Sequence, residues 1–447
     1  IWRGRGVGGS SAVNGMLAVR PEPDDLDRWA AGGCSGWTWD DMLPWFNCIE
    51  TDLDYGADPW HGNAGPFPVW RPPVKGWGGV ELAALEALRD AGHPWCLDHN
   101  APDSTGVGPY AANIDFASDP GGRRVSTSSA YLEDARDRPN LRVIGDALVE
   151  SIIIENRTAV GVTCRIDGNT EVFEAAEVLL SSGAPHTPAL LLRSGIGGDA
   201  MGSFAESVHH LPGVGEAVSD HPGIGVQILS DGGDVAPPSN GRHINCFGRY
   251  GSGLGGGGSN DMAWLAGAHP EPLPNGRYAS QIQVALWQPF STGSLRLVDA
   301  DPAVHPHIDV NMLADARDVL RLRDGFRRLM DVMRHPAVRS IPGRRSYGRN
   351  AEVIESIEDI ARLDDDGVDE LLLDSVYDTQ HIVGGCRMGS PMDRSAVVDP
   401  SCRVIGIDRL RVIDSSVFPT CPRANTHFTV LAIAERMAHR IRTGGDG

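Results

Sequence analysis

Short apolar runs recur across the middle of the chain. The runs at 141–144, 148–154 and 160–166 alternate or stay apolar, which is typical of β-strands. Asn156 and Arg157 supply turn residues between the last two runs. The pattern therefore predicts successive strands, the last two joined as a hairpin.

A strand, a turn and a helix are predicted next. The apolar run 178–180 leads into a Ser-Ser-Gly-Ala turn at 181–184. Thr187 is expected to cap the following helix and Pro188 to occupy its first turn, because a hydroxyl satisfies a free N–H group and proline has none to satisfy. The sequence thus predicts a helix over 189–192 directly after a buried strand.

The second half of the chain predicts a sheet followed by a long helix. The runs at 282–287, 293–298 and 306–308 are typical of strands in an antiparallel sheet. Apolar residues then recur at helical spacing over 322–333, and Pro336 ends this helix. We interpret the apolar stripe of the helix as core packing.

Two other stretches of the sequence have a recognisable pattern. Residues 231–260 hold many glycines, including the run 255–258, and this composition favours a flexible linker over a gating lid. Near the C-terminal end, 410–413 predicts a buried strand and the apolar positions from Phe428 to Met437 predict a helix.

Composition and charge exclude several classes of protein. The chain has 447 residues, 41% of them hydrophobic, which is enough for two domains. It carries 39 basic and 59 acidic residues, and the formal charge of −20 argues against nucleic acid or an anionic membrane surface as a partner. No apolar run approaches the roughly 20 residues that cross a bilayer, so no transmembrane segment is predicted.

The cysteines and histidines give no metal-binding pattern. Eight cysteines are scattered along the chain without a C-x-x-C pair, which predicts neither a zinc site nor a disulfide scaffold. The histidine pairs His209 with His210 and His305 with His307 have no carboxylate at metal-ligand spacing. We therefore expect no bound metal, and reduced thiols in a cytoplasmic protein.

The chain opens on a loop of glycine and small hydroxyl residues. Gly8, Gly9 and Ser10 are followed by Asn14 and Gly15. Glycine has no Cβ, so such a loop lets the main chain approach a large anionic cofactor and turn free N–H groups towards it. Taken alone, a run of this kind is an ordinary turn.

Two distant segments, 183–197 and 414–427, make the interpretation of this loop specific. Together the three segments resemble the flavin cradle of the glucose-methanol-choline oxidoreductases, a family of alcohol-oxidising enzymes that carry FAD. The most specific match is 183–197, which reads GAPHTPALLLRSGIG. The segment 213–222 resembles a further family segment, with Ala217 where asparagine is usual.

The resemblance implies a fold and a division into domains. The expected fold is α/β, with a Rossmann-like FAD-binding domain interleaved with an α+β substrate domain built on an antiparallel sheet. The FAD-binding domain is expected at 1–225, the substrate-binding domain at 226–385, and a C-terminal return to the FAD-binding domain at 386–447.

The resemblance also implies how FAD is held. Val13 stands where family members with covalently attached flavin have histidine, so non-covalent FAD is expected. The helix after Asn425 would offer free N–H groups and positive potential to a reduced flavin. The expected contacts come from Gly8, Gly9, Ser10, Asn14, Gly15, Leu17, Val149, Asp414, Ser415, Thr426 and His427.

Two positions carry the expected catalytic chemistry. The block 381–389 resembles the family segment that brings a histidine over the flavin, with Gly385 where threonine is usual, and aligning Pro419 with the family's proline puts Asn425 in the second catalytic position. Oxidising an alcohol requires loss of the hydroxyl proton and transfer of the α-hydrogen as hydride. His381 is expected to take the proton and the Asn425 amide to stabilise the alkoxide.

The resemblance implies a choline- or alcohol-dehydrogenase-like enzyme. Its expected partners are a small-molecule alcohol and an electron acceptor, which is dioxygen, a quinone or a redox carrier. One alternative is a dehydrogenase of the kind associated with mycofactocin, which passes electrons to a quinone or redox carrier. A lyase, or a flavin-binding protein without redox turnover, would keep the same cradle and change the substrate pocket.

A serine hydrolase is an alternative from another class. Residues 8–12 nearly fit G-x-S-x-G, but the last glycine is replaced and no strand precedes the serine. Gly4, Gly6 and Gly9 likewise fit G-x-G-x-x-G, yet only three residues come before them, whereas a dinucleotide fingerprint follows a strand. In the family, the fingerprint and the ribose-binding acid lie upstream of the matched region, so an N-terminally incomplete chain is expected.

Overall fold

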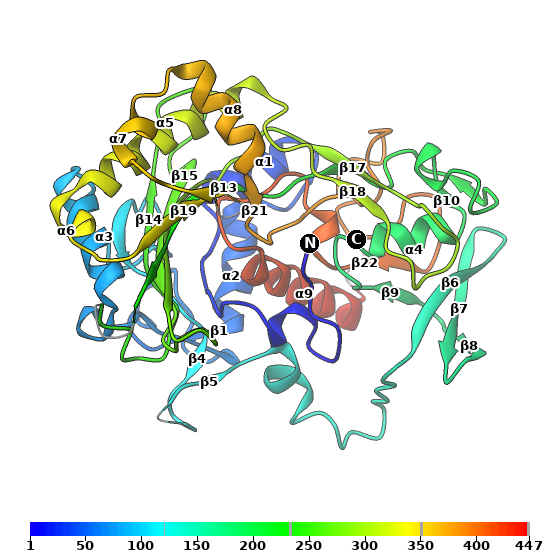
Figure 1. The fold of residues 1–447 in the computed structure, drawn as a ribbon. Coiled ribbons are helices and arrows are strands. Elements are labelled where there is room, and N and C mark those ends of the chain that lie inside the picture. The colour runs from blue at the N-terminus through cyan, green and yellow to red at the C-terminus, as the bar shows by residue number, and fades with distance from the viewer. Residues whose placement is uncertain (120, 232–234, 349–351, 445–447) are drawn as a thin grey trace.

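A large antiparallel sheet occupies one half of the molecule (Figure 1). The computed structural model describes residues 1–119, 121–231, 235–348 and 352–444. The strand order is β20-β19-β13-β16-β15-β14-β3, and β21 also pairs with β13. These strands are β3 (Gly106–Pro109), β13 (Pro222–Ser230), β14 (Ile244–Tyr250), β15 (Met262–Ala268), β16 (Tyr278–Leu286), β19 (Arg344–Tyr347), β20 (Glu352–Val353) and β21 (Tyr377–Asp378).

The two faces of this sheet bury different side chains, because successive residues of a strand point to opposite faces. In the register of β13 with β16, Ile224 lies opposite Val284 and Val226 lies opposite Ile282. These four residues belong to a core cluster that includes α3 (Gly79–Asp90) and α5 (Ala316–Arg334). Four alternate residues of the strands, Phe247, Ala263, Leu265 and Ala285, belong to a smaller cluster. Its other members are Leu17, Val19, Tyr110, Trp287 and Ala424.

Helix α5 confirms the helix predicted over 322–333. Its stripe of Leu322, Phe326, Leu329, Met330 and Met333 is fully buried. The helix ends at Arg334 because the next helix, α6 (Pro336–Arg339), begins with a proline, whose ring disfavours helical geometry in the residue before it.

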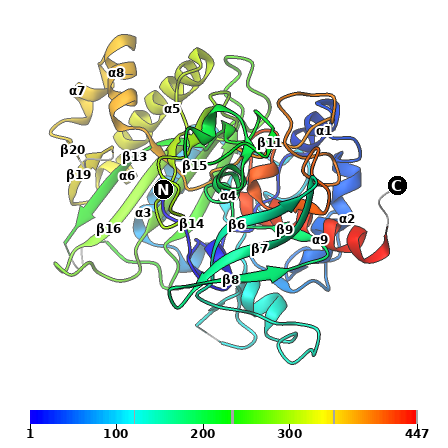
Figure 2. The ribbon, with the colours of Figure 1, turned by 90° about the vertical axis from the view of Figure 1, so that its right-hand side faces the viewer.

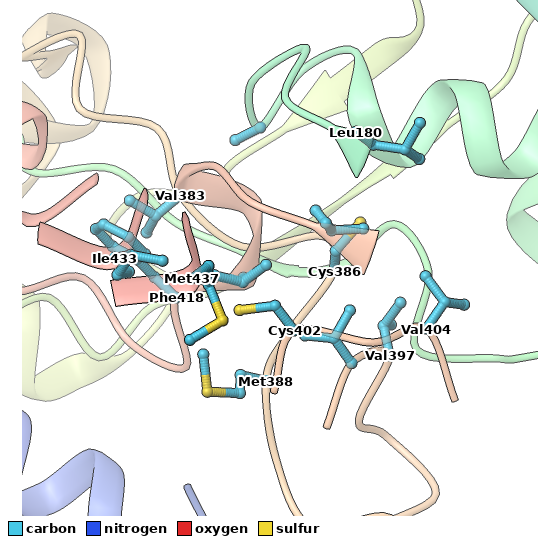
Figure 3. Packing of buried hydrophobic residues seen from close by; sticks show 14 of the residues in the cluster. Leu180, Val383, Cys386, Met388, Val397, Cys402, Val404, Phe418, Ile433 and Met437 are labelled. Carbon is cyan, nitrogen blue, oxygen red and sulfur yellow. The ribbon is translucent and has the colours of Figure 1, made fainter. Parts of the chain in front are cut away.

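A larger core cluster fills the other half of the molecule. Parallel pairing of β9 (Val178–Leu180) with β22 (Leu410–Val412) brings together strands more than 200 residues apart. Helices α2 (Trp39–Ile49), α4 (Thr187–Arg193) and α9 (Thr426–Thr443) contribute to the same cluster. Figure 3 shows its sulfur-containing residues Cys386, Met388, Cys402 and Met437 packed among aliphatic side chains.

A three-stranded antiparallel sheet extends from this half, and Figure 2 looks onto it. It consists of β6 (Leu148–Glu155), β7 (Thr158–Ile166) and β8 (Asn169–Glu174). The turn at Asn156 and Arg157 takes positive φ values of 50° and 63°, as a tight hairpin requires. The hairpin predicted from the sequence is therefore confirmed.

The remaining elements are short. The helices are α1 (Pro23–Ala31), α7 (Ile357–Ala361) and α8 (Asp365–Ser375), with single turns η1 (Gly9–Ala12), η2 (Val74–Gly76), η3 (Ser128–Leu132), η4 (Asp199–Met201) and η5 (Ser415–Val417). The strands are β1 (Glu50–Asp52), β2 (Phe67–Val69), β4 (Ile114–Asp115), β5 (Arg123–Arg124), β10 (Ile196–Gly197), β11 (His209–His210), β12 (Glu216–Val218), β17 (Gly293–Arg296) and β18 (His307–Asp309).

The structure corrects three local predictions. Residues 141–144 form no strand, since no neighbouring strand pairs with them. Thr187 is the first residue of α4 and not its cap, because its hydroxyl bonds to Asp414. The strand β17 pairs with β12 on one side and β18 on the other, in a separate small sheet and not beside β16.

The glycine-rich stretch 231–260 contains more structure than a linker. Its middle part includes β14, a buried strand of the large sheet. Asp261 receives hydrogen bonds from the Ser252 amide and hydroxyl, which anchors the loop that follows β14. Residues 232–234, within the same stretch, lie outside the described residues.

Both α/β character and the large antiparallel sheet agree with the predicted fold class. The domain divisions at 225 and 385 stay a prediction. Among the described residues, no helix combines the length and the apolar character needed to cross a membrane.

A buried network of charges surrounds His61. Its Nδ1 atom lies 2.7 Å from Glu50 Oε1 and 3.0 Å from Asp52 Oδ2. Its Nε2 atom lies 2.9 Å from Asp98 Oδ2. Burial alone would lower the pKa of His61, but hydrogen bonds to the three carboxylates outweigh burial and raise it to about 10. His61 is therefore an imidazolium at neutral pH.

Two arginines complete the network. Arg20 pairs with Glu50 at 2.6 Å and Arg71 pairs with Asp98 at 2.7 Å. Taken without the arginines, Glu50, Asp52 and His61 lie close enough together to hold a metal ion. The two guanidinium groups and the imidazolium already balance the carboxylates, so the network is a set of ion pairs that joins β1 to the segments on either side of it.

We expect His61→Ala to lower the free energy of unfolding by about 3 to 5 kcal/mol, because removing one partner leaves buried carboxylates uncompensated.

The raised pKa of His61 also determines how the stability of the protein depends on pH. Its contribution is fully present below its unfolded value of about 6.5 and is lost as the pH rises through about 10. Denaturant unfolding at pH 7 and pH 10.5 measures both effects. The exposed His307→Ala variant is the control, and equal stability of the His61→Ala and wild-type proteins at pH 7 would contradict the expectation.

Candidate active site

The structure brings His381 and Asn425 into direct contact. His381 follows β21, and Asn425 is the residue immediately before α9. The distance from His381 Nε2 to Asn425 Nδ2 is 2.9 Å. The two side chains come from segments that are 44 residues apart in the sequence.

Tyr110 fixes which way the Asn425 amide points. The Tyr110 hydroxyl donates to Asn425 Oδ1 at 2.7 Å. Since a phenol at neutral pH donates one hydrogen, the acceptor end of the amide faces Tyr110 and the NH₂ group faces His381. The amide can therefore donate a directed hydrogen bond on the His381 side.

His381 is held in its neutral form. Burial lowers the pKa of His381 well below its usual value, and the neighbouring His221 and Arg3 lower it further. A neutral imidazole has a lone pair that can accept a proton, so a histidine in this state can act as a base.

The backbone of His381 is anchored to Asp220. The His381 amide donates to Asp220 Oδ1 at 3.0 Å, and the His221 amide donates to the same oxygen at 2.8 Å. Burial, the largest effect, raises the pKa of Asp220 to about 7. Asp220 and His221 are buried and His381 is half-buried, and the three form one group.

The first loop has a backbone geometry that would let a large cofactor approach its main chain closely. Gly8 has φ 92° and Gly9 has φ 52°, values that side-chain-bearing residues adopt only with strain. A Cβ on Gly8 would also lie 3.3 Å from the Ser128 side chain. Ser10 accepts from the Gly4 amide at 3.2 Å, and Asn14 Oδ1 accepts from Arg124 Nη1 at 2.9 Å.

Asp414 joins the second and third segments of the predicted cradle. Its Oδ2 atom accepts from the Gly183 amide at 2.8 Å and from the Thr187 hydroxyl at 2.6 Å. Its Oδ1 atom accepts from the Ser416 amide at 2.8 Å. The next residue, Ser415, accepts from the Gly384 amide, which ties this junction to the His381 segment.

The N-terminus of α9 has free donors and an unpaired buried histidine. Asn425 makes no side-chain capping bond there, because its amide is engaged with Tyr110 and His381. His427 lies in the first turn after Thr426, and burial lowers its pKa to about 4. His427 Nε2 is buried without a hydrogen-bond partner in the protein. An orphaned polar atom beside free N–H groups fits an additional polar group, such as the flavin ring.

The other residues predicted to contact FAD lie in different parts of the fold. Leu17 belongs to the small cluster that contains Tyr110, which bonds to Asn425. Gly15 lies two residues before it in the opening loop. Val149 lies in β6, where it pairs with Cys164 and packs against the larger core cluster.

Several residues of the site were missed by the sequence reasoning. His221 Nδ1 lies 3.0 Å from His381 Nδ1, and Thr379 Oγ1 lies 2.9 Å from the same atom. Trp287 stacks on His221 with ring centroids 4.4 Å apart. The segment 213–222 already contained His221, but its contact with His381 depends on the pairing of β13 with β21.

Comparisons with known proteins show the family of this chain. Models of the GMC oxidoreductase family match residues 1–223 and 289–434. The 5-(hydroxymethyl)furfural oxidase of Methylovorus sp. (strain MP688) is 34% identical over 99% of this chain and 83% of its own length. The oxygen-dependent choline dehydrogenase of Photobacterium profundum is 31% identical over 98% of this chain and 79% of its own length.

A solved structure has a similar fold. The pyridoxine 4-oxidase from Mesorbium loti superimposes with a TM-score of 0.85 and 26% identity, over 99% of this chain and 84% of that one. The chain belongs to the GMC oxidoreductase family. It is an FAD-dependent oxidoreductase that acts on the CH–OH group of donors.

Proposed function

We propose that this protein oxidises a small-molecule alcohol to an aldehyde or ketone, with His381 as the base and Asn425 as the group that stabilises the alkoxide. The observation that carries this proposal is the 2.9 Å contact between His381 Nε2 and Asn425 Nδ2. When bound, FAD supplies the acceptor for the hydride that leaves the alcohol carbon.

The two residues have separate tasks. The neutral His381 imidazole accepts the hydroxyl proton at Nε2, since burial lowers its pKa and keeps that lone pair free of a proton. The Asn425 amide has no titrating proton, and Tyr110 holds its NH₂ group on the His381 side. A fixed donor of this kind stabilises negative charge that develops on the alcohol oxygen.

We propose that FAD is held without a covalent bond. The support is Val13, whose aliphatic side chain has no nucleophile, and the cradle of Gly8, Gly9 and Ser10. Asp414 and Ser415 would bring the middle and C-terminal cradle segments against the cofactor, and Thr426 and His427 would face it from the start of α9. Asn14, Gly15, Leu17 and Val149 complete the proposed set of contacts.

The relatives support a primary alcohol as the substrate and dioxygen as one acceptor. Their names give 5-(hydroxymethyl)furfural, choline and pyridoxine as compounds they act on, and two are oxidases. A quinone or redox carrier is the second acceptor class, as in the mycofactocin-associated alternative.

A cytoplasmic location is also our proposal, supported by eight cysteines that form no disulfide in the structure.

An anaerobic titration tests the function. The FAD-loaded protein is mixed with simple primary and secondary alcohols, choline, pyridoxine and 5-(hydroxymethyl)furfural, and the flavin absorbance is followed. We expect at least one primary alcohol to bleach the flavin, with colour restored by air or by a quinone. A bound flavin that no alcohol bleaches would contradict the proposal and favour a lyase or a non-catalytic flavoprotein.

Substitutions at the contact pair should separate the roles. We expect His381→Ala to slow flavin reduction about 10²- to 10⁴-fold with flavin retained, because a positioned base is lost. Asn425→Ala should slow it about 10²- to 10³-fold, as for removal of one oxyanion donor. Stopped-flow reduction by the best alcohol of the panel measures both.

His427→Ala is the matched comparison at the same helix start. We expect it to change flavin affinity or reduction potential more than the rate of hydride transfer. If His427→Ala abolishes reduction while Asn425→Ala reduces normally, the catalytic pair is His381 with His427 and the proposed register is wrong.

Acid precipitation tests how the flavin is attached. With Val13 in place of a nucleophile, we expect all of the yellow chromophore to move into the supernatant when the protein is precipitated with acid. Val13→Ala should behave in the same way. Yellow colour that stays in the washed pellet would mean that another residue carries a covalent bond.

A further inference from the structure

The position of the proton on His221 follows from its contact with a main-chain carbonyl. The residue is buried, with its ring stacked on Trp287 at an angle of 16°. Burial lowers the pKa of His221 to about 4, so the ring is neutral and carries a single N–H. Its Nε2 atom lies 2.9 Å from the carbonyl oxygen of Pro422, which can only accept. The proton therefore lies on Nε2, and Nδ1 holds a lone pair.

The state of His221 determines the state of His381. The two Nδ1 atoms are 3.0 Å apart, so one of them must carry a proton for the contact to be attractive. Because His221 Nδ1 holds a lone pair, His381 Nδ1 carries the proton. Thr379 Oγ1 lies 2.9 Å from His381 Nδ1 and can accept from the same N–H. His381 is neutral, so its own lone pair lies on Nε2.

The contact on the opposite side of the His381 ring independently supports a lone pair at Nε2. Asn425 Nδ2 can only donate, and it lies 2.9 Å from His381 Nε2. The Tyr110 hydroxyl orients that amide, and burial raises the pKa of Tyr110, so the phenol keeps its proton. The hydrogen-bonded line from the Pro422 carbonyl to the Tyr110 hydroxyl thus has one consistent assignment of donors and acceptors.

We propose that His221 is a positioning residue that fixes His381 as the Nδ1–H tautomer, with its lone pair at Nε2. This inference rests on the proposed function, in which His381 is the base. In that reaction the alcohol O–H bond breaks, an N–H bond forms at His381 Nε2, and the α-hydrogen leaves with its electron pair for the flavin. The resulting imidazolium keeps its Nδ1–H bond to His221, which stabilises the positive charge.

The Cys421 thiol and the charges around His381 leave this assignment unchanged. Cys421 Sγ lies 3.2 Å from His221 Nε2, and burial raises the pKa of this thiol well above its usual value. A thiol proton aimed at Nε2 would require a lone pair there, facing the Pro422 carbonyl at repulsive range. Asp220 binds the backbone of His381, and the charge of Arg3 lowers the pKa of His381.

Nuclear magnetic resonance of the histidine rings tests the tautomer directly. The full chain with FAD bound is labelled with ¹⁵N-histidine, and His381 is assigned with a His381→Gln variant. We expect a protonated-type signal for His381 Nδ1 and an unprotonated-type signal for Nε2. His221 should show the reverse pattern. A proton on His381 Nε2 in the wild-type protein would overturn the inference.

Two substitutions at His221 separate positioning from packing. His221→Phe keeps an aromatic ring against Trp287 but removes the acceptor, so His381 should lose its single tautomer. His221→Asn places an amide oxygen near the former Nδ1 position and should restore it. His99→Phe is the control, because His99 is a buried histidine against Phe247 whose ring nitrogens have no hydrogen-bond partners. It should leave the His381 signals unchanged.

Kinetics supply the second readout. We expect His221→Phe to reduce kcat and kcat/KM together by about 10²- to 10⁴-fold, as for a base in the wrong tautomer, and to lower the apparent pKa of flavin reduction. His221→Asn should recover at least tenfold of that loss. Equal losses in the Phe and Asn variants, with unchanged His381 signals, would show that His221 only packs.

The two proposals fail separately. If the wild-type protein shows the expected ring signals but no alcohol reduces its flavin, the tautomer assignment stands and the proposed reaction fails. If alcohol reduces the flavin but His381 carries its proton on Nε2, the reaction stands and the role of His221 fails. Should His221→Phe not fold, the wild-type and His221→Asn signals decide the question.

Discussion

The carboxylate of Asp414 holds the functional half of the molecule together. It accepts hydrogen bonds from Gly183 and Thr187 on one side and from Ser416 on the other. Through these bonds the turn before α4, the strand pair β9 and β22, and the segment leading to α9 keep a fixed relation. Because Ser415 also accepts from Gly384, the same junction sets the distance from α9 to the His381 segment.

Burial has opposite consequences for two histidines of this chain. His61 lies among carboxylates, which outweigh the cost of burying a charge and raise its pKa to about 10. His381 has a neutral imidazole, an amide and a hydroxyl as its ring partners, so burial dominates and lowers its pKa. The first arrangement suits a permanent ion pair. The second leaves a lone pair that can take a proton.

The large sheet links core packing to the site. One face packs on α3 and α5, and on the other face Phe247 of β14 joins Tyr110 and Trp287, which lie one residue beyond β3 and β16. Tyr110 orients Asn425, and Trp287 stacks on His221. The sheet therefore helps to position Tyr110 and Trp287, which contact Asn425 and His221.

The sequence by itself determined the elements that depend on residues close together in the chain. The stripe of α5, the hairpin of β6 and β7 and the strand β9 were predicted correctly, because spacing, turn residues and proline act over a few positions. Motif resemblance also brought His381 and Asn425 forward as a pair. Tertiary structure alone decided that residues 141–144 form no strand and that Thr187 bonds to Asp414 in place of capping α4. It also decided the contact of His221 with His381, because sheet pairing brings together residues 160 positions apart.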